Sequence, residues 1–151
     1  AVVAPFEEGS AIMFRVASHK NNMLSEAEVN ITAAIEENID GKLVSKFYQI
    51  EPTLKKINSF SLNWTLVHKI DSNSPFYGFS EDDFKNTDIE LIIMIKAFDE
   101  VFANTVVQRT SYITPEIVYG ARFLPMYHSS EDNKTTILDL DKIDDYQVVK
   151  I

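Results

Sequence analysis

The sequence predicts an all-β protein with the architecture of a β-sandwich, and three observations support this. Apolar and polar side chains alternate with a period of two in several segments. Turn signals separate these segments, at "NIDGK", "SNSP" and "SSEDNK". Helical patterns are scarce. Many short strands joined by regular turns are typical of sandwiches.

Two segments show the alternation most clearly. In "SEAEVNITAAI" (25–35) the apolar face is opposed by Glu26, Glu28, Asn30 and Thr32. In "FSLNWTLVH" (60–68) Phe60, Leu62, Trp64 and Leu66 share one face. We expect further strands at 11–17, 43–50, 89–98, 101–113, 117–127 and 135–140.

One helix is predicted, over residues 80–87. Ser80 can cap its first turn, and Asp83, three residues later, completes a capping box. No repeat, linker or low-complexity segment divides the chain, so residues 1–151 are expected to form one domain.

Charge and composition exclude several classes of function. The formal net charge of −9 argues against nucleic acid as a partner. There are no cysteines, which excludes disulfides and thiolate zinc sites. No apolar run approaches the roughly 20 residues of a membrane helix. The chain starts without methionine or a signal peptide, so we expect it to be part of a longer protein.

No catalytic, metal or cofactor motif is present. His19, His68 and His128 lack the spacing of a zinc helix, and "DLDKIDD" (139–145) matches a calcium loop only in acid content. A nucleophile elbow and a glycine-rich nucleotide loop are also missing. We therefore expect no metal and no cofactor.

The stretch "WTLVHKIDSNSPFYGFSEDDF" (64–84) joins a strand, a loop and a helix, an arrangement that can hold an active site. His68, Asp71, Ser72 and Ser74 could form a catalytic cluster. The structural interpretation is stronger, because Asp-led and Ser-Pro turns are ordinary loop chemistry. On that interpretation Phe76 and Tyr77 pin the loop to the sandwich.

Three motifs in order resemble the cytoplasmic domain of inward rectifier potassium channels, the bacterial branch in particular. They are "MFRVASHKNNMLSEAEV" (13–29), the 64–84 stretch and "QRTSYITPEIVYGARF" (108–123). The resemblance implies an immunoglobulin-like β-sandwich that forms a homotetrameric ring. The ring would extend a potassium pathway below a pore in the inner membrane. The pore and the basic linker that meets anionic lipid would precede Ala1.

The resemblance also assigns roles to residues. Glu26 matches a carboxylate that lines the cytoplasmic pore, and its polar-face position agrees. The segment "KAFDEVFANT" (96–105) matches a girdle loop at the membrane end of that pore, with Ala97, Phe98 and Ala103 near the constriction. Four apolar side chains around an axis form a steric and dewetting barrier. Glu100 and Arg109 match a pair that joins neighbouring girdle loops.

Departures from the family pattern concern charge. Lys96 replaces a second pore acid, and the Lys55–Lys56 region replaces expected aspartates. Strong block by polyamines relies on such acids, so mild rectification is expected. Lys20 takes the place of a basic residue below the lipid-facing linker.

Two other classes of function stay open. One is a monomeric β-sandwich that binds a protein or carbohydrate ligand. The other is an enzyme built on a β-sandwich, which would need a pocket with convergent titratable groups.

Overall fold

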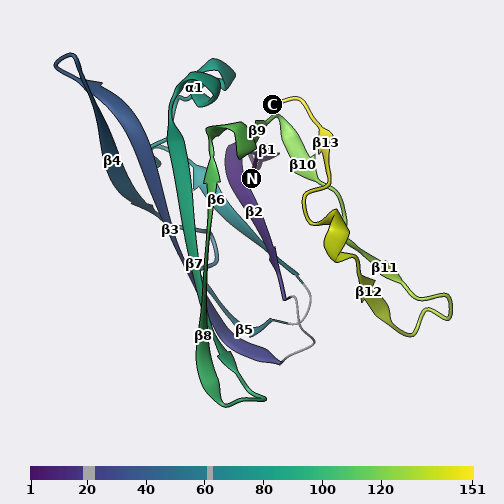
Figure 1. Ribbon diagram of the computed structural model, residues 1–151. Coiled ribbons are helices and arrows are strands. Elements are labelled where there is room, and N and C mark those ends of the chain that lie inside the picture. Colours follow the sequence, from purple (N-terminus) through teal and green to yellow (C-terminus); the bar gives the residue numbers. More distant parts are fainter. Residues whose placement is uncertain (19–22, 61–62) are drawn as a thin grey trace.

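Two packed sheets form the body of the protein, as shown by a computed structural model that describes residues 1–18, 23–60 and 63–151 (Figure 1). The first sheet has the strand order β6-β2-β1-β9, with bounds β1 (Val2–Phe6), β2 (Gly9–Ala17), β6 (Asn63–Ile70) and β9 (Val118–Tyr119). The second, called the large sheet here, has the order β4-β3-β7-β8 with β5 also on β3. Its bounds are β3 (Leu24–Ile39), β4 (Lys42–Ile50), β5 (Lys56–Phe60), β7 (Ile89–Asp99) and β8 (Asn104–Ile113).

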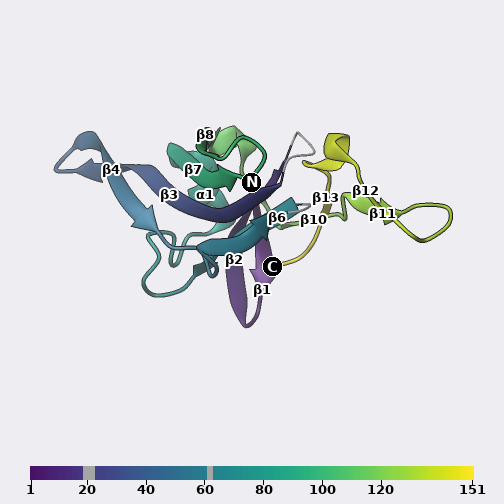
Figure 2. The ribbon, with the colours of Figure 1, turned by 90° about the horizontal axis from the view of Figure 1, so that it is seen from below.

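Both sheets contribute to one core. Figure 2 shows the two layers end-on, with β3, β7 and β8 on one side and β6, β2 and β1 on the other. The core joins Ile12 and Phe14 of β2 and Leu66 of β6 to the alternating apolar residues of β3 and β7. The predicted all-β sandwich is therefore confirmed. The single α-helix of the described chain, α1, is short (Glu81–Asn86).

Local sequence signals account for several elements. Ser80 Oγ accepts the Asp83 amide at 3.2 Å, and Asp83 Oδ2 accepts the Ser80 amide at 2.8 Å, so the predicted capping box is confirmed. Asp40 and Gly41 both have positive φ, of 51° and 80°. This is the two-residue turn that joins β3 and β4.

A C-terminal arm leaves the sandwich after β9 and returns to it. It contains β10 (Ala121–Phe123), β11 (Tyr127–Ser129), β12 (Thr136–Leu138) and β13 (Tyr146–Val148), with short 3₁₀ turns η1 (Thr114–Glu116) before it and η2 (Leu140–Lys142) within it. β10 pairs with β13, and β11 with β12. The β11–β12 hairpin projects to one side of the body (Figure 1).

The structure corrects four boundaries. The predicted strand 60–68 is wrong as one unit, because Phe60 ends β5 in the large sheet whereas β6 belongs to the other sheet. The segment 101–113 is a turn followed by β8. The segment 117–127 divides into β9, β10 and a loop, while 135–140 contains only the three-residue β12. The strands β1 and β13 were not predicted, since each is short and lacks extended alternation.

Candidate functional site

The outer face of the large sheet carries most of the predicted site residues. Register places on this one face side chains from three adjacent strands: Glu28, Asn30, Thr32, Ala34 and Glu36 of β3; Glu90, Ile92, Met94, Lys96 and Phe98 of β7; and Thr105, Val107, Arg109, Ser111 and Ile113 of β8. Directly paired residues in a sheet point to the same side. The opposite side packs into the core.

This outer face mixes polar and charged side chains with apolar ones, several of which are open to water. Val107 is 59 % exposed and Ile113 is 48 % exposed, and both lie on β8, an edge strand of the sheet. Phe98 is also exposed, and Ile92 and Met94 are half-buried. An open edge beside exposed apolar side chains is a surface suited to contact with another chain.

Glu26 lies at a β-bulge at the start of β3. The register of β3 against β7 shifts between Ser25 and Glu28, so two residues of β3 oppose one residue of β7. Glu26 has φ 51°, the left-handed conformation, and its side chain is exposed. The bulge interrupts the period of two, so alternation alone could not place Glu26.

Lys96 is exposed on the outer face, where it lies directly opposite Glu28 of β3 and Val107 of β8. Its neighbour in sequence, Ala97, is only 4 % exposed and faces the core. Within one chain the Ala97 side chain therefore lies on the core side of the sheet, opposite to Lys96 and Phe98, and its place near a constriction stays a prediction.

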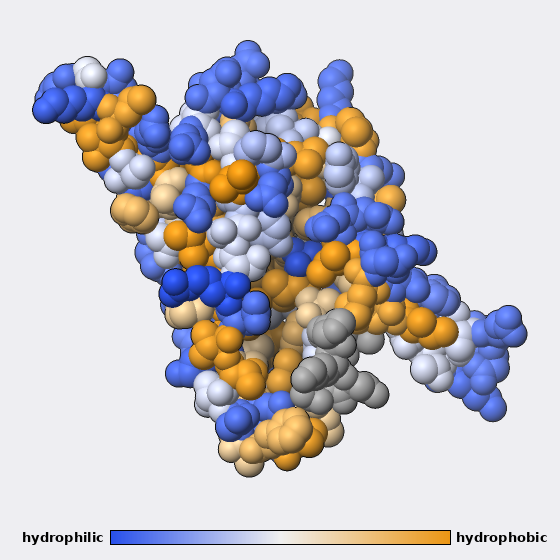
Figure 3. Space-filling model, viewed as in Figure 1, coloured by the Kyte–Doolittle hydropathy of each residue, from blue (hydrophilic) through white to orange (hydrophobic). Residues whose placement is uncertain are grey.

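The tip of the girdle loop, residues 100–103, presents an apolar surface that the sequence analysis missed. Val101 and Phe102 are 63 % and 69 % exposed. The Glu100 amide donates to the Met23 carbonyl at 3.0 Å, which brings the exposed Met23 to the same tip. In Figure 3 apolar side chains gather at this lower end of the molecule. Ala103 completes the turn with a left-handed φ of 52°.

A buried carboxylate shapes this tip. Asp99 is 4 % exposed, and its Oδ1 accepts the amides of Val101 at 2.9 Å and Phe102 at 3.2 Å. The side chain thus replaces backbone partners that the tight turn cannot supply. Because Asp99 ends β7 opposite both Leu24 and Asn104, it ties the turn to the sheet.

Glu100 and Arg109 do not meet within one chain. Arg109 lies five residues beyond Asn104, the residue at which β8 leaves the turn, which corresponds to about 17 Å along a strand. Both side chains are exposed. Contact between these two residues therefore requires a second chain. The predicted lipid-proximal residue Lys20 lies outside the described residues.

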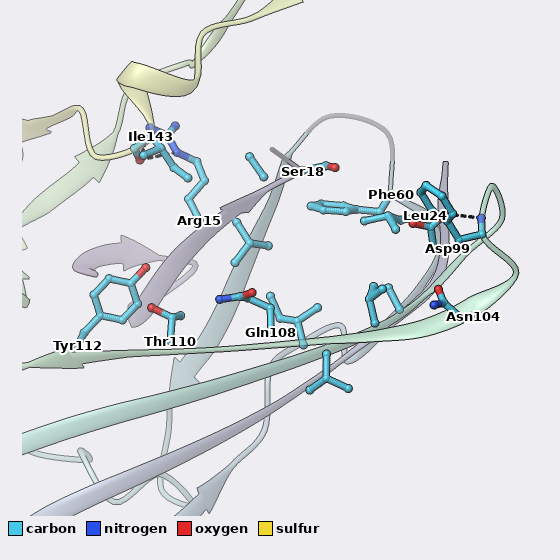
Figure 4. A pocket seen from close by; sticks show the side chains of 17 residues that line it. Arg15, Ser18, Leu24, Phe60, Asp99, Asn104, Gln108, Thr110, Tyr112 and Ile143 are labelled. Carbon is cyan, nitrogen blue, oxygen red and sulfur yellow. Dashed lines mark hydrogen bonds between the residues drawn. The ribbon is translucent and has the colours of Figure 1, made fainter. Parts of the chain in front are cut away.

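A cavity of about 800 Å³ lies behind the girdle loop, between the inner side of β8 and β2 (Figure 4). Its walls are mainly apolar, with Leu24, Phe60 and Val106 among them. Polar groups come from Asn104, Gln108, Thr110 and Tyr112 along β8.

Arg15 holds the C-terminal arm against β2 beside this cavity, a role that no motif or spacing in the sequence indicates. Its Nε donates to the Ile143 carbonyl at 2.9 Å, and its Nη2 to the Lys142 carbonyl at 2.6 Å; Nη1 also donates to the Leu124 carbonyl. The guanidinium lies 4.5 Å from the ring centre of Phe123. Only the fold brings these residues, more than 100 positions apart in sequence, together.

The 71–79 loop is a packing element. Phe76 is fully buried and stacks on Phe84 of α1 at 5.5 Å between ring centres. Tyr77, in contrast, is 65 % exposed, so the expectation that it pins the loop is wrong. Tyr77 directly follows Phe76 in the turn, so its side chain points away from the sandwich while that of Phe76 points into it.

Of the imagined catalytic cluster, only His68 and Ser74 meet. Ser74 Oγ donates to His68 Nε2 at 2.8 Å, because His68 Nδ1 bears the proton that it donates to the Glu51 carbonyl at 2.8 Å. Ser74 Oγ also accepts the Phe76 amide at 3.2 Å. Both side chains are buried, and burial lowers the pKa of His68. Asp71 instead caps the turn through the Asn73 amide. The pair braces the loop that positions Phe76.

Two further findings bear on chemistry. Among the residues that the structure describes, no group of three or more His, Asp and Glu side chains is arranged to hold a metal ion. In the same residues, no helix is long and apolar enough to cross a bilayer.

Fold and site together define a β-sandwich domain with an exposed, partly apolar sheet face. The chain belongs to the inward rectifier potassium channel C-terminal domain family, whose model matches residues 1–151. This is a family of channel domains, not of enzymes.

Named relatives agree with this assignment. The chain is 30 % identical over 142 residues to "Inward rectifier potassium channel Kirbac3.1" of Paramagnetospirillum magnetotacticum, covering 93 % of this chain and 48 % of that protein. It is 31 % identical over 136 residues to "ATP-sensitive inward rectifier potassium channel 8" of Mus musculus, covering 87 % and 32 %. The chain thus spans half or less of the length of these relatives.

Proposed function

We propose that this chain is the cytoplasmic pore and gating domain of a homotetrameric inward rectifier potassium channel in the inner membrane. Four copies surround an axis and extend the potassium pathway beyond the membrane. The observation that carries this proposal is the outer face of the large sheet, which places charged and apolar side chains side by side and open to water.

In this ring the outer face near β7 and β8 lines the axis and the contact with the next chain. Glu26 and Lys96 lie on the wall of the pathway. Phe98 and the girdle tip narrow it at one end, where apolar side chains exclude water from a closed gate. Glu100 of each chain pairs with Arg109 of its neighbour, which fits their separation within a single chain.

Gating follows from rigid-body motion of the ring against the membrane pore. The girdle tip is the part best placed to transmit it, since the Glu100–Met23 backbone bond joins the tip to the chain that leads into β3. Anionic lipid would act through the linker that precedes Ala1 and through the Lys20 region.

Assembly is tested by measuring mass in solution as a function of salt. Each chain carries −9 and a ring of four carries −36, so association should strengthen as salt screens this repulsion. A monomer at every concentration and salt level would favour the alternative, a monomeric β-sandwich that binds a protein or carbohydrate. A ring whose assembly does not change with salt would contradict only the electrostatic part of this prediction.

Ion handling is tested in the full-length channel by applying spermine from the cytoplasmic side. A ring of four Lys96 side chains offsets the attraction of Glu26 for multivalent amines. Lys96→Glu should therefore strengthen block. Equal block in the wild type and the variant would show that Lys96 does not line the pathway.

A further inference from the structure

The inner side of β8 is polar, unlike that of the neighbouring strand β7. Its side chains face the same way as the buried residues of β7, because Val106 lies directly opposite Ala97, which is buried. Apart from Val106, the inner side chains of β8 are polar and uncharged: Asn104, Gln108, Thr110 and Tyr112. The cavity of about 800 Å³ separates this polar row from β2.

The remaining walls of the cavity are mainly apolar. They include Val16 of β2, Leu24 of β3, Phe60 of β5, and Ile95 and Ala97 of β7. Figure 4 shows Leu24 and Phe60 across the cavity from Gln108 and Thr110. The volume lies in the range of roughly 300–1,000 Å³ that is usual for small-molecule sites. A molecule in this space would thus meet apolar groups on one side and hydrogen-bonding groups on the other.

Charged groups lie at the two ends of the cavity, and both are already engaged (Figure 4). At one end Arg15 donates to the Ile143 carbonyl, from Nε at 2.9 Å and from Nη2 at 2.8 Å. At the other end Asp99 Oδ1 accepts the amides of Val101 and Phe102. An ion that entered would lose its hydration without meeting a free counter-charge, which costs far more than the burial of a neutral group. The arrangement therefore favours an uncharged molecule.

We propose that this cavity is a binding site for an uncharged, mainly apolar small molecule that carries hydrogen-bonding groups along one side. Its apolar side packs on Leu24 and Phe60, and its polar groups bond to Gln108 and Thr110. Gln108 keeps its amide oxygen for this purpose, since its Nε2 donates to the Arg109 carbonyl at 3.3 Å. The site lies within a single chain, so this inference goes beyond the proposed function and does not depend on it.

A molecule bound in the cavity would also contact the girdle loop. Asp99 and Phe102 line the cavity, and both belong to the girdle segment 96–105. Because Asp99 holds the amides of Val101 and Phe102, contact with these side chains should limit the opening of the turn. Binding should therefore slow hydrogen exchange at these two amides. A molecule adsorbed elsewhere on the surface would leave their exchange unchanged.

The test uses two dyes that share one ring skeleton and differ in charge. N-phenyl-naphthylamine is neutral, and anilinonaphthalene sulfonate carries an added sulfonate. Both become fluorescent in apolar sites, so titration of the purified chain gives a dissociation constant for each dye. We expect the neutral dye to bind about tenfold tighter or more, because the sulfonate would have to be desolvated beside charges that are already engaged. The neutral dye should also slow exchange at the Val101 and Phe102 amides.

Two tryptophan variants locate the bound dye. Val106→Trp should weaken binding of the neutral dye by about tenfold or more, because the new ring occupies the space of the dye. Val106 is 38 % exposed on an edge strand, so the change leaves the packing of the core intact. Thr105→Trp is the matched control. It adds the same ring one residue away on the outer face, opposite Phe98, and should leave binding at the wild-type value.

Several outcomes would overturn this inference. They are equal affinity for the two dyes, equal loss of binding in the two tryptophan variants, and unchanged exchange at the Val101 and Phe102 amides when the neutral dye is bound. A neutral dye that is released as the chain associates would overturn it too, because a second copy would then be the occupant of the cavity. The proposed function is tested separately, by the mass measurement and by spermine block.

Discussion

Two loops of this domain contain similar residues, but one buries its aromatic side chain and the other leaves it exposed. The 71–79 loop and the girdle tip at 100–103 each combine acidic, aromatic and small side chains. The first buries Phe76 completely, whereas the second leaves Phe102 69 % exposed. Both are braced by polar side chains: His68 and Ser74 in one, Asp99 in the other. Polar side chains can thus hold either kind of turn in place. When the apolar residue of the turn faces the core, the turn stabilises the fold. When that residue faces water, it is available for contact with another chain.

The largest expected effect is on the buried aromatic residue. Phe76→Ala should lower the free energy of unfolding by about 3–5 kcal/mol, because it removes a ring that packs against Phe79 and Phe84. Denaturant unfolding of the isolated domain measures this. Phe102→Ala, the matched change in the girdle tip, should cost little in the monomer. Equal losses in both variants would contradict the comparison.

The next largest effect is expected at Ser74, which braces the 71–79 loop. Ser74→Ala should cost about 1–3 kcal/mol, since it leaves buried His68 Nε2 and the Phe76 amide without their partner. The same unfolding measurement applies. Ser72→Ala, in the same turn, is the control and should be near neutral. A Ser72 variant as unstable as the Ser74 variant would show that the turn, not the histidine bond, matters.

The Asp99 brace should act locally. Asp99→Ala removes the acceptor of the Val101 and Phe102 amides, so hydrogen exchange at these two amides should speed up. Asp99→Asn keeps an acceptor oxygen and should preserve more of the protection. If the Val101 and Phe102 amides exchange at the same rate in both variants, the negative charge of Asp99, and not its acceptor oxygen, holds the tip.

The His68 brace also predicts a dependence on pH. Burial holds the pKa of His68 below its ordinary value, so the unfolded chain takes up a proton that the folded chain refuses. The free energy of unfolding from this group should thus fall as pH drops through about 6.5, and level off below the folded pKa. Asp71 and Glu51 lie close enough to limit the effect. In His68→Gln the free energy of unfolding should fall less steeply as pH drops from neutral through about 6.5. An unchanged slope would show that carboxylates, and not His68, cause the fall.

The smallest effect is expected at Tyr77. Because its side chain is mostly exposed beside buried Phe76, Tyr77→Ala should change the free energy of unfolding by no more than about 0.5 kcal/mol. Comparison with Phe76→Ala by thermal unfolding would define where the packing role of this loop ends. A loss comparable to that of Phe76 would show that Tyr77 packs on the loop itself.

The sequence by itself determined the sandwich, the alternating faces of β3, the capped helix and the absence of catalytic motifs. These follow from period, turn chemistry and residue type, which act over a few neighbouring residues. The family also follows from the order of three motifs along the chain. Alternation also placed Glu28 on the polar face of its strand, opposite to the buried residues Ala27 and Val29.

Tertiary structure decided which of these side chains meet. The bulge at Glu26 sets the register that places Glu28 between Lys96 and Lys56, and the switch of sheets after Phe60 gives Lys56 its place beside β3. Likewise, Ala97 faces the core while Phe98 faces outward, and Arg15 reaches carbonyls more than 100 residues away. Pairing across strands depends on the whole sheet, because one residue of shift turns every side chain to the other face.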